Sequence, residues 1–307
     1  MVNAIHLTIT TINSLGIVHS YNAGGDVAVT SQGWVVPPKY SCQVFTIGVN
    51  RFVLEGATLL DDGSIFDDDF RNNITAASEI TDCAKKSRAR PSVALYTKDY
   101  PFDKCTPEGL NYTEFRDQAQ ALVTNYGEEE VLFRIWAGNF QESSWQMARN
   151  ISNVIRHHLR TTSGKRASAS LGFAAEPVYA PLWGYIERAH VGLFDARDIG
   201  ISFTRGIIDH LTTLGVSRSQ VRLSIETSGF LLSTLMPMAY NKLIRKGVPY
   251  FGDGHFEGSV YHSQKQVHEK VELIKDERLK GFSLSHILSD LPFNDTRSLL
   301  DAALYHS

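Results

Sequence analysis

The sequence has few cysteines, no long apolar run and no marked excess of one charge. Its 307 residues include 3 cysteines, 30 Lys and Arg and 33 Asp and Glu, which gives a formal net charge of -3. This balance provides no broad basic field for nucleic acid or an anionic membrane surface. No apolar stretch approaches the roughly 18 to 20 residues that a membrane-spanning helix requires. We therefore expect no nucleic acid and no membrane among the partners of the chain.

Motifs for metals and cofactors are also missing. Cys42, Cys83 and Cys105 have neither CxxC spacing nor a nearby histidine, which argues against a zinc site. The pair Gly24-Gly25 lacks the G-x-G-x-x-G spacing of a phosphate-binding loop, and we interpret 22–26 as a loop that follows the first strand. The sequence therefore predicts no metal site and no cofactor.

The N-terminus and the Asn-X-Ser/Thr sequons bear on location. The segment 1–16 lacks the basic n-region of a signal peptide, so it reads as mature chain with no visible leader. Chance alone would give about two or three sequons, and four are present. We therefore predict a secreted, extracellular glycoprotein, with glycosylation candidates at Asn73, Asn111, Asn150 and Asn294.

Apolar runs rich in β-branched and aromatic residues alternate with segments of helical periodicity. The predicted strands are 17–21, 44–52, 92–97, 131–136, 168–174, 189–194, 221–227 and 281–287. The predicted helices include 112–126, 145–159, 199–214 and 263–274. Alternation without a linker favours an α/β fold with one domain over 1–307, a single (β/α)8 TIM barrel. The ligand site of such a barrel lies at the C-terminal ends of its strands, near Tyr21, Phe52, Thr97, Trp136, Ala174, Phe194, Thr227 and His286.

One short motif joins the predicted helix at 112–126 to the fourth strand. The helix ends in Tyr126-Gly127, and the strand after it runs to Trp136. This arrangement is similar to a helix that ends in Tyr-Gly and leads into a D-x-x-D-x-D-x-E strand.

A second group of motifs lies at the end of the chain. The segment 280–286, the following Asp290 and the run 298–302 are similar to a last barrel strand, its acidic turn and a terminal S-L-L-x-A helix. Weaker matches are the strand after Cys42, to C-T-H-x-x-Y-x-F, and 193–195, to M-x-Y-D. Together the motifs resemble glycoside hydrolase family 18, the chitinase and chitinase-like family, and so imply a chitinase-like barrel.

The resemblance implies substrate-assisted hydrolysis, but the residues for it are degraded. A strand-four Glu of the family protonates the leaving oxygen, and an Asp two positions earlier orients the N-acetyl group. The four acidic positions of that strand carry Glu129, Leu132, Arg134 and Trp136. An indole cannot donate that proton, and a guanidinium has no basic lone pair at ordinary pH. Phe194 lacks the hydroxyl of the M-x-Y-D tyrosine, although Asp195 remains, and His286 replaces a Trp that floors the sugar site. We therefore expect a pseudoenzyme of the chitinase family, which keeps the fold and lacks the catalytic residues.

The segment between the last two strands is short. Only about 53 residues separate Thr227 from Gly281, and we expect the crossover around the helix at 263–274 to need most of them. We therefore expect the barrel to lack a full chitinase insertion domain and to have a shallower cleft than relatives that contain one.

Two functions remain open. The first is a catalytically inactive, chitinase-like barrel that binds a carbohydrate or a protein or acts as a scaffold. Aromatic side chains near the strand ends can stack on sugar rings, and the binding candidates are Tyr96, Tyr100, Phe140, Tyr179 and Trp183. The alternative is a glycoside hydrolase that pairs Glu226 with Glu142 or Glu176, since retaining enzymes hold two carboxyl groups about 5 Å apart. Against that pairing, Glu142 is also suited to the first turn of a helix.

The barrel prediction also suggests a cysteine pairing. Cys42 lies just before the predicted second strand, and Cys83 lies near the end of the following helix, which returns to the same face. Cys105 follows the third strand on the opposite face. We therefore predict a disulfide between Cys42 and Cys83, with Cys105 free or paired between chains.

Overall fold

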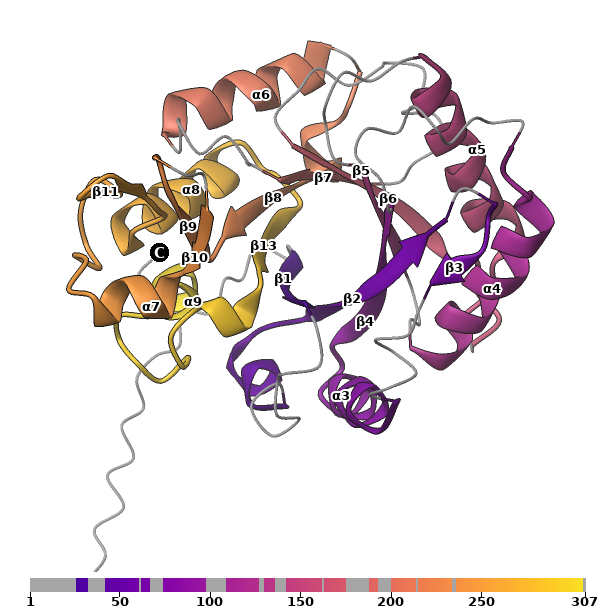
Figure 1. The fold of residues 1–307 in the computed structure, drawn as a ribbon, viewed down its shortest axis with the longest axis horizontal. Coiled ribbons are helices and arrows are strands. Elements are labelled where there is room, and N and C mark those ends of the chain that lie inside the picture. The colour runs from indigo at the N-terminus through magenta and orange to yellow at the C-terminus, as the bar shows by residue number, and fades with distance from the viewer. Residues whose placement is uncertain are drawn as a thin grey trace, which may run out of the picture.

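The computed structural model describes 26–32, 42–60, 62–66, 74–97, 109–126, 130–135, 142–161, 163–174, 188–192, 200–213, 215–233 and 236–305. These residues form a mixed α/β structure in which parallel strands lie at the centre and helices lie outside them (Figure 1). No helix among the described residues is long and apolar enough to cross a membrane.

The parallel strands pair in a closed order. Their bounds are β1 (Asp26–Gln32), β2 (Arg51–Leu59), β4 (Arg90–Thr97), β5 (Glu130–Ile135), β6 (Ser168–Ala174), β7 (Arg188–Gly192), β8 (Val221–Glu226) and β13 (Gly281–Ser285). Each strand pairs in parallel with the next one in this series, and β1 pairs with both β2 and β13. The pairings therefore return to their starting strand, and we call this arrangement the strand ring. The short β3 (Ile65–Phe66) is antiparallel to the end of β2.

Helices cover the outside of the strand ring (Figure 1). The longer ones are α3 (Ile74–Lys86), α4 (Tyr112–Asn125), α5 (Glu142–His158), α6 (Ile201–Thr213) and α8 (Gln264–Asp276), and α9 (Leu299–Tyr305) ends the described chain. Short 3-10 helices are η1 (Phe45–Ile47), η4 (Arg218–Gln220) and η5 (Ile287–Ser289). Buried apolar residues at helical spacing, such as Phe115, Ala119 and Leu122 of α4, pack against the strands. At the start of α8, Ser263 and Gln266 form a capping box.

Alternate residues of β2 face opposite sides of the sheet. Phe52 and Leu54 belong to the main core that includes the helices, whereas Val53 forms a separate apolar cluster with Ala94 of β4. Because side chains alternate along a strand, Arg51, Val53 and Glu55 face the inside of the strand ring. The inside is therefore partly polar, and a guanidinium nitrogen of Arg51 donates to the hydroxyl of Ser92 at 3.1 Å.

A small antiparallel sheet follows β8. Its strands are β9 (Ser228–Leu231), β10 (Met236–Ala239), β11 (His255–Phe256) and β12 (Ser259–Val260), in the order β10-β9-β12-β11. The helix α7 (Tyr240–Arg245) lies between β10 and β11 in the chain. The expectation of little beyond a crossover helix in this segment is therefore wrong, because a compact α+β unit fits into 228–260. Strands of two to four residues are too short to give a periodic signal.

The positions of the first two strands also need correction. β1 is Asp26–Gln32, so Gly24-Gly25 precedes the first strand and does not follow it. The predicted strand at 17–21 lies outside the described residues. The predicted strand at 44–52 is helical over 42–47, and β2 begins at Arg51. A short apolar run fits a buried helical turn as well as a strand. The C-terminal ends are therefore Gln32 and Leu59, in place of Tyr21 and Phe52.

The other six predicted ring strands are confirmed within two residues at each end. The structure also joins Cys42 to Cys83 in a disulfide with a Cα separation of 5.5 Å. This bond ties the segment after β1 to α3, which follows β2. Cys105 lies outside the described residues.

Candidate functional site

The C-terminal end of β8 carries a buried carboxylate. Glu226 is the last residue of β8, is 3% exposed, and is in register with Ser285 of β13. The hydroxyl of Ser224 lies 3.5 Å from Oε1 of Glu226 and 2.8 Å from the hydroxyl of Ser285. A chain of polar groups thus joins Glu226 to the neighbouring strand, at the end of the strand ring where barrel sites form.

The buried side chains of His262 and Lys270 lie next to the backbone at this end of β8. Nδ1 of His262 lies 3.1 Å from the carbonyl oxygen of Glu226, and Nε2 contacts Nζ of Lys270 on α8. A carbonyl only accepts and an ammonium only donates, so Nδ1 carries the hydrogen and Nε2 accepts. Burial, followed by the charge of Lys270, holds the pKa of His262 well below its usual value. His262 is therefore neutral and fixed in one tautomer.

A second carboxylate on β2 meets a histidine that follows β13. Glu55 is 1% exposed, and its Oε2 lies 3.5 Å from Nδ1 of His286. Neighbouring strands are about 4.8 Å apart, and β1 separates β13 from β2, so the two backbones are about 10 Å apart. Both side chains must therefore reach across β1 to meet. We call Glu55 and His286 the carboxylate–imidazole pair.

The backbone beside this pair is held in an uncommon conformation. His286 has φ 57° and ψ 60°, a left-handed conformation that is unfavourable for residues other than glycine. The hydroxyl of the buried Thr227 contacts the carbonyl oxygens of both Ser285 and His286, which it reaches from the end of β8. These contacts turn the chain at the end of β13 and direct the imidazole toward Glu55.

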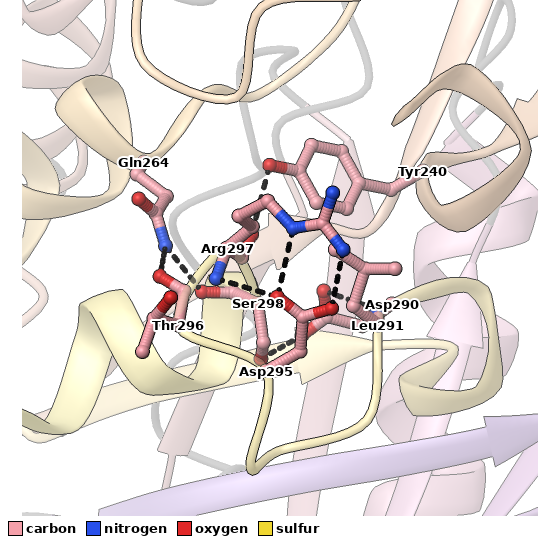
Figure 2. Close-up of polar contacts among 8 residues, drawn as sticks. All are labelled: Tyr240, Gln264, Asp290, Leu291, Asp295, Thr296, Arg297 and Ser298. Carbon is pink, nitrogen blue, oxygen red and sulfur yellow. Dashed lines mark hydrogen bonds and ion pairs between the residues drawn. The ribbon is translucent and has the colours of Figure 1, made fainter. Parts of the chain in front are cut away.

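A polar network fixes the loop that follows His286 (Figure 2). The carboxylate of Asp290 accepts from the backbone N–H groups of Leu291, Leu299 and Leu300 and from the hydroxyl of Ser298. Asp290 thereby caps the start of α9. Burial raises the pKa of Asp290 to about 6, although these four hydrogen bonds act in the opposite direction.

Side chains from two other segments hold the same loop. Nε2 of Gln264 donates to the backbone carbonyl oxygens of Thr296 and Ser298. The hydroxyl of Tyr240 donates to the backbone carbonyl oxygen of Arg297 (Figure 2). Arg297 also forms an ion pair with Asp295 at 2.7 Å. The small α+β unit and α8 thus position the loop that connects β13 to α9.

Most of the family-like catalytic positions fall outside the described residues. These are Glu129, Trp136, Phe194 and Asp195. Leu132 and Arg134 lie on β5, where Arg134 is in register with Tyr96 of β4 and Gly172 of β6. Counted from β1, β5 is the fourth strand of the ring. The structure therefore places this part of the motif on the strand that the resemblance implies.

The other predicted site residues are scattered. Tyr96 lies on β4, and Glu142 begins α5. The remaining candidates, Tyr100, Phe140, Glu176, Tyr179 and Trp183, lie outside the described residues. No group of three or more metal-ligating side chains occurs within the described parts of the chain.

The predicted glycosylation sites differ in their surroundings. Oδ1 of Asn111 accepts from two backbone N–H groups at the start of α4, and Nδ2 of Asn150 donates to the hydroxyl of Tyr112 at 3.0 Å. Asn294 is exposed in the loop before α9, where its side chain forms no hydrogen bond to a described residue. Asn73 lies outside the described residues.

The sequence interpretation missed Glu55, His262 and Lys270 as site residues. Glu55 lies beyond the predicted end of the second strand, so its position inside the ring was not recognised. Apart from Thr58, the other residues of 52–59 are apolar or glycine, and a lone carboxylate in such a run is a signal that could have identified Glu55, because a glutamate is almost never fully buried unless it has a partner. The contact between His262 and Lys270 depends on the placement of α8 against β8, which no local pattern encodes.

Comparison with known proteins finds similarity in structure only. No family sequence model matches the chain, and neither does any curated protein sequence. Among solved structures, a chitinase from Bacteroides thetaiotaomicron matches with a TM-score of 0.72 and 9% identity over 91% of this chain and 95% of that chain. The class V chitinase from Nicotiana tobaccum gives 0.69 and 13% over 91% and 98%.

The chain has the fold of these chitinases. The spore cortex-lytic enzyme SleL from Bacillus cereus is also similar, with a TM-score of 0.67, 11% identity and coverage of 91% of this chain and 74% of that chain. Each of these three matches covers 91% of this chain. At these low identities the likeness establishes the fold, and the chemistry depends on the residues of this chain.

Proposed function

We propose that the chain is a chitinase-like (β/α)8 TIM barrel that binds an oligosaccharide without hydrolysing it. The observation that carries the proposal is the identity of the residues at the fourth strand of the ring. Arg134 lies on the fourth strand of the ring, and Trp136 follows directly after that strand. Those positions would hold the orienting Asp and the proton-donating Glu of a family 18 enzyme. Neither side chain can perform that step.

Polar groups toward the C-terminal end of the strand ring favour binding over the other non-catalytic roles. Glu226 and Ser285 end β8 and β13, and Glu55 is in register with Gln32, the last residue of β1. A barrel that serves only as a scaffold has no need of polar groups at this end of its strands. A protein is the other ligand that a binding barrel of this kind could take. The location that fits the sequons is extracellular, because N-glycosylation takes place in the secretory pathway.

The test combines a hydrolysis assay with a binding assay. A chromogenic chitotriose reporter should release no product, and chitotetraose should bind when titrated by calorimetry. Trp136→Glu alone should leave the protein inactive, because catalytic groups that act as a unit are not restored singly. Turnover by the wild-type protein that is abolished by a substitution in the strand ring would contradict the proposal.

A hydrolase that uses other carboxylates is the second candidate function. The observation in its favour is Glu226, which is buried at the end of β8 beside Ser224. Turnover of an aryl glycoside that disappears in Glu226→Gln, but persists in Asp253→Asn outside the strand ring, would favour the hydrolase. Equal background rates in both variants would leave the binding protein as the function.

A further inference from the structure

The carboxylate–imidazole pair joins residues that are far apart in the chain. Glu55 lies on β2 and His286 lies directly after β13, yet Oε2 and Nδ1 are 3.5 Å apart. The imidazole is 16% exposed, while the carboxylate is fully buried. A buried carboxylate beside one ring nitrogen sets the orientation and tautomer of a histidine, as it does in hydrolase triads.

Two further features hold this histidine in place. Its left-handed backbone is a conformation that is unfavourable for a residue other than glycine, and such conformations cluster at functional sites. The hydroxyl of Thr227 fixes the carbonyl groups on both sides of the turn. Backbone strain, a clamp from β8 and a carboxylate from β2 therefore converge on one partly exposed imidazole.

We propose that the carboxylate–imidazole pair is a ligand-binding dyad, in which Glu55 orients His286 and the Nε2 edge of the imidazole hydrogen-bonds a hydroxyl or amide group of an oligosaccharide. This inference rests on the proposed carbohydrate-binding function and assigns a contact residue to it. Glu55 is a positioning residue, because it acts through the ring that it faces. At 3.5 Å the contact is long for a hydrogen bond, as contacts of this kind often are in structures without a ligand.

The test uses the whole chain and two probes, chitotetraose and cellotetraose. His286→Asn keeps a residue that tolerates the left-handed backbone but shortens the side chain. We expect it to weaken calorimetric binding of the bound probe at least about tenfold, which is the effect of a lost hydrogen bond in a water-excluded site. The matched control is His255→Gln, which changes an exposed histidine on β11 and should leave the dissociation constant unchanged.

A spectroscopic measurement separates positioning from a structural role. The ring-nitrogen resonances of His286 should move when the probe is added to wild-type protein. Glu55→Gln should shift the tautomer balance of His286 and weaken binding of the probe. A substitution of Thr227 that merely loosens the fold would instead move resonances across the whole chain. This measurement needs no substitution of His286, so it holds even if His286→Asn fails to fold.

The outcomes distinguish this inference from the proposed function. Probe binding that is unchanged in His286→Asn, or His286 resonances that are unaffected by a bound probe, would overturn the dyad and leave the carbohydrate-binding function intact. Absence of binding by the wild-type protein to either probe would overturn both. Preference for chitotetraose over cellotetraose would assign the contact to the N-acetyl group, and equal affinity would assign it to a hydroxyl group.

Discussion

The buried carboxyl group of Asp290 gives a quantitative prediction for the pH dependence of the free energy of unfolding. Burial raises its pKa to about 6, while the unfolded chain retains the usual value of 3.8. The native state therefore binds the proton more tightly, so the contribution is fully present below about pH 3.8 and is lost as the pH rises through about 6. The difference between these two values corresponds to about 3 kcal/mol.

The perturbation is Asp290→Asn, which removes the titration and keeps the shape of the side chain. Unfolding by urea, followed by tryptophan fluorescence between pH 3.5 and 7.5 at constant ionic strength, gives the free energy of unfolding of both proteins. The wild-type value minus the variant value should fall by about 3 kcal/mol across this range. Asp290→Asn also exchanges an acceptor oxygen for a donor, but that cost does not depend on pH.

The control for this experiment lies in the same loop. The ion pair with Arg297 lowers the pKa of Asp295, so its contribution has the opposite sign and is lost as the pH falls. Asp295→Asn should therefore produce a small difference that runs the other way, because an exposed pair is weak. A wild-type minus Asp290→Asn difference that stays flat or rises with pH would refute the conclusion that burial dominates the four hydrogen bonds.

Three further outcomes are expected. Gly229→Ala should lower the free energy of unfolding in urea by about 1 to 3 kcal/mol, because a Cβ would lie 2.7 Å from Leu243 and 2.8 Å from Tyr261. Gly206→Ala on α6, which has open space around it, should instead raise that free energy by about 0.5 to 1 kcal/mol. Equal effects of the two substitutions would contradict the packing around Gly229. Lys270→Met should raise the pKa of His262 in a proton NMR titration, since the ammonium disfavours imidazolium, and an unchanged pKa would contradict the contact. When the chain is directed through a eukaryotic secretory pathway, glycopeptide mass spectrometry should find a glycan on Asn294 and none on Asn150, whose amide packs against Tyr112; a modified Asn150 would contradict this.

Strands of the second half of the ring were readable from the sequence because apolar residues recur in them at every second position, as Val221, Leu223 and Ile225 do in β8. β6 and β8 begin at the predicted residues, and β13 also does. β2 was misplaced because the apolar run before it, which includes Val44 and Phe45, forms a buried helical turn. The predicted strand therefore ended at Phe52, before the site residue Glu55.

The site was less predictable than the fold because it is made by long-range contacts. The resemblance to family 18 directed attention to His286 and to β5, which is the fourth strand of the ring counted from β1. The partner of His286 could not follow from any spacing, since it lies on β2 and reaches across β1. Glu226 was identified from its place at the end of a strand, but its connection to Ser285 depends on the register between β8 and β13.

The polar interior bears on the choice between a binding barrel and an inert scaffold. Barrel interiors are commonly filled by layers of branched apolar side chains. Here Arg51, Glu55, Arg222 and Glu226 are all at most 3% exposed. Burying charged groups is costly even when they are paired, and apolar replacements of similar volume are often neutral or stabilising. A chain that needed only a rigid core would therefore gain from apolar residues at these positions. Both carboxylates lie toward the C-terminal end of the strand ring, where Glu226 ends β8 and Glu55 is in register with Gln32 at the end of β1. Charged groups held in a water-excluded site form strong and directional hydrogen bonds, so these positions favour the proposed binding function over a scaffold.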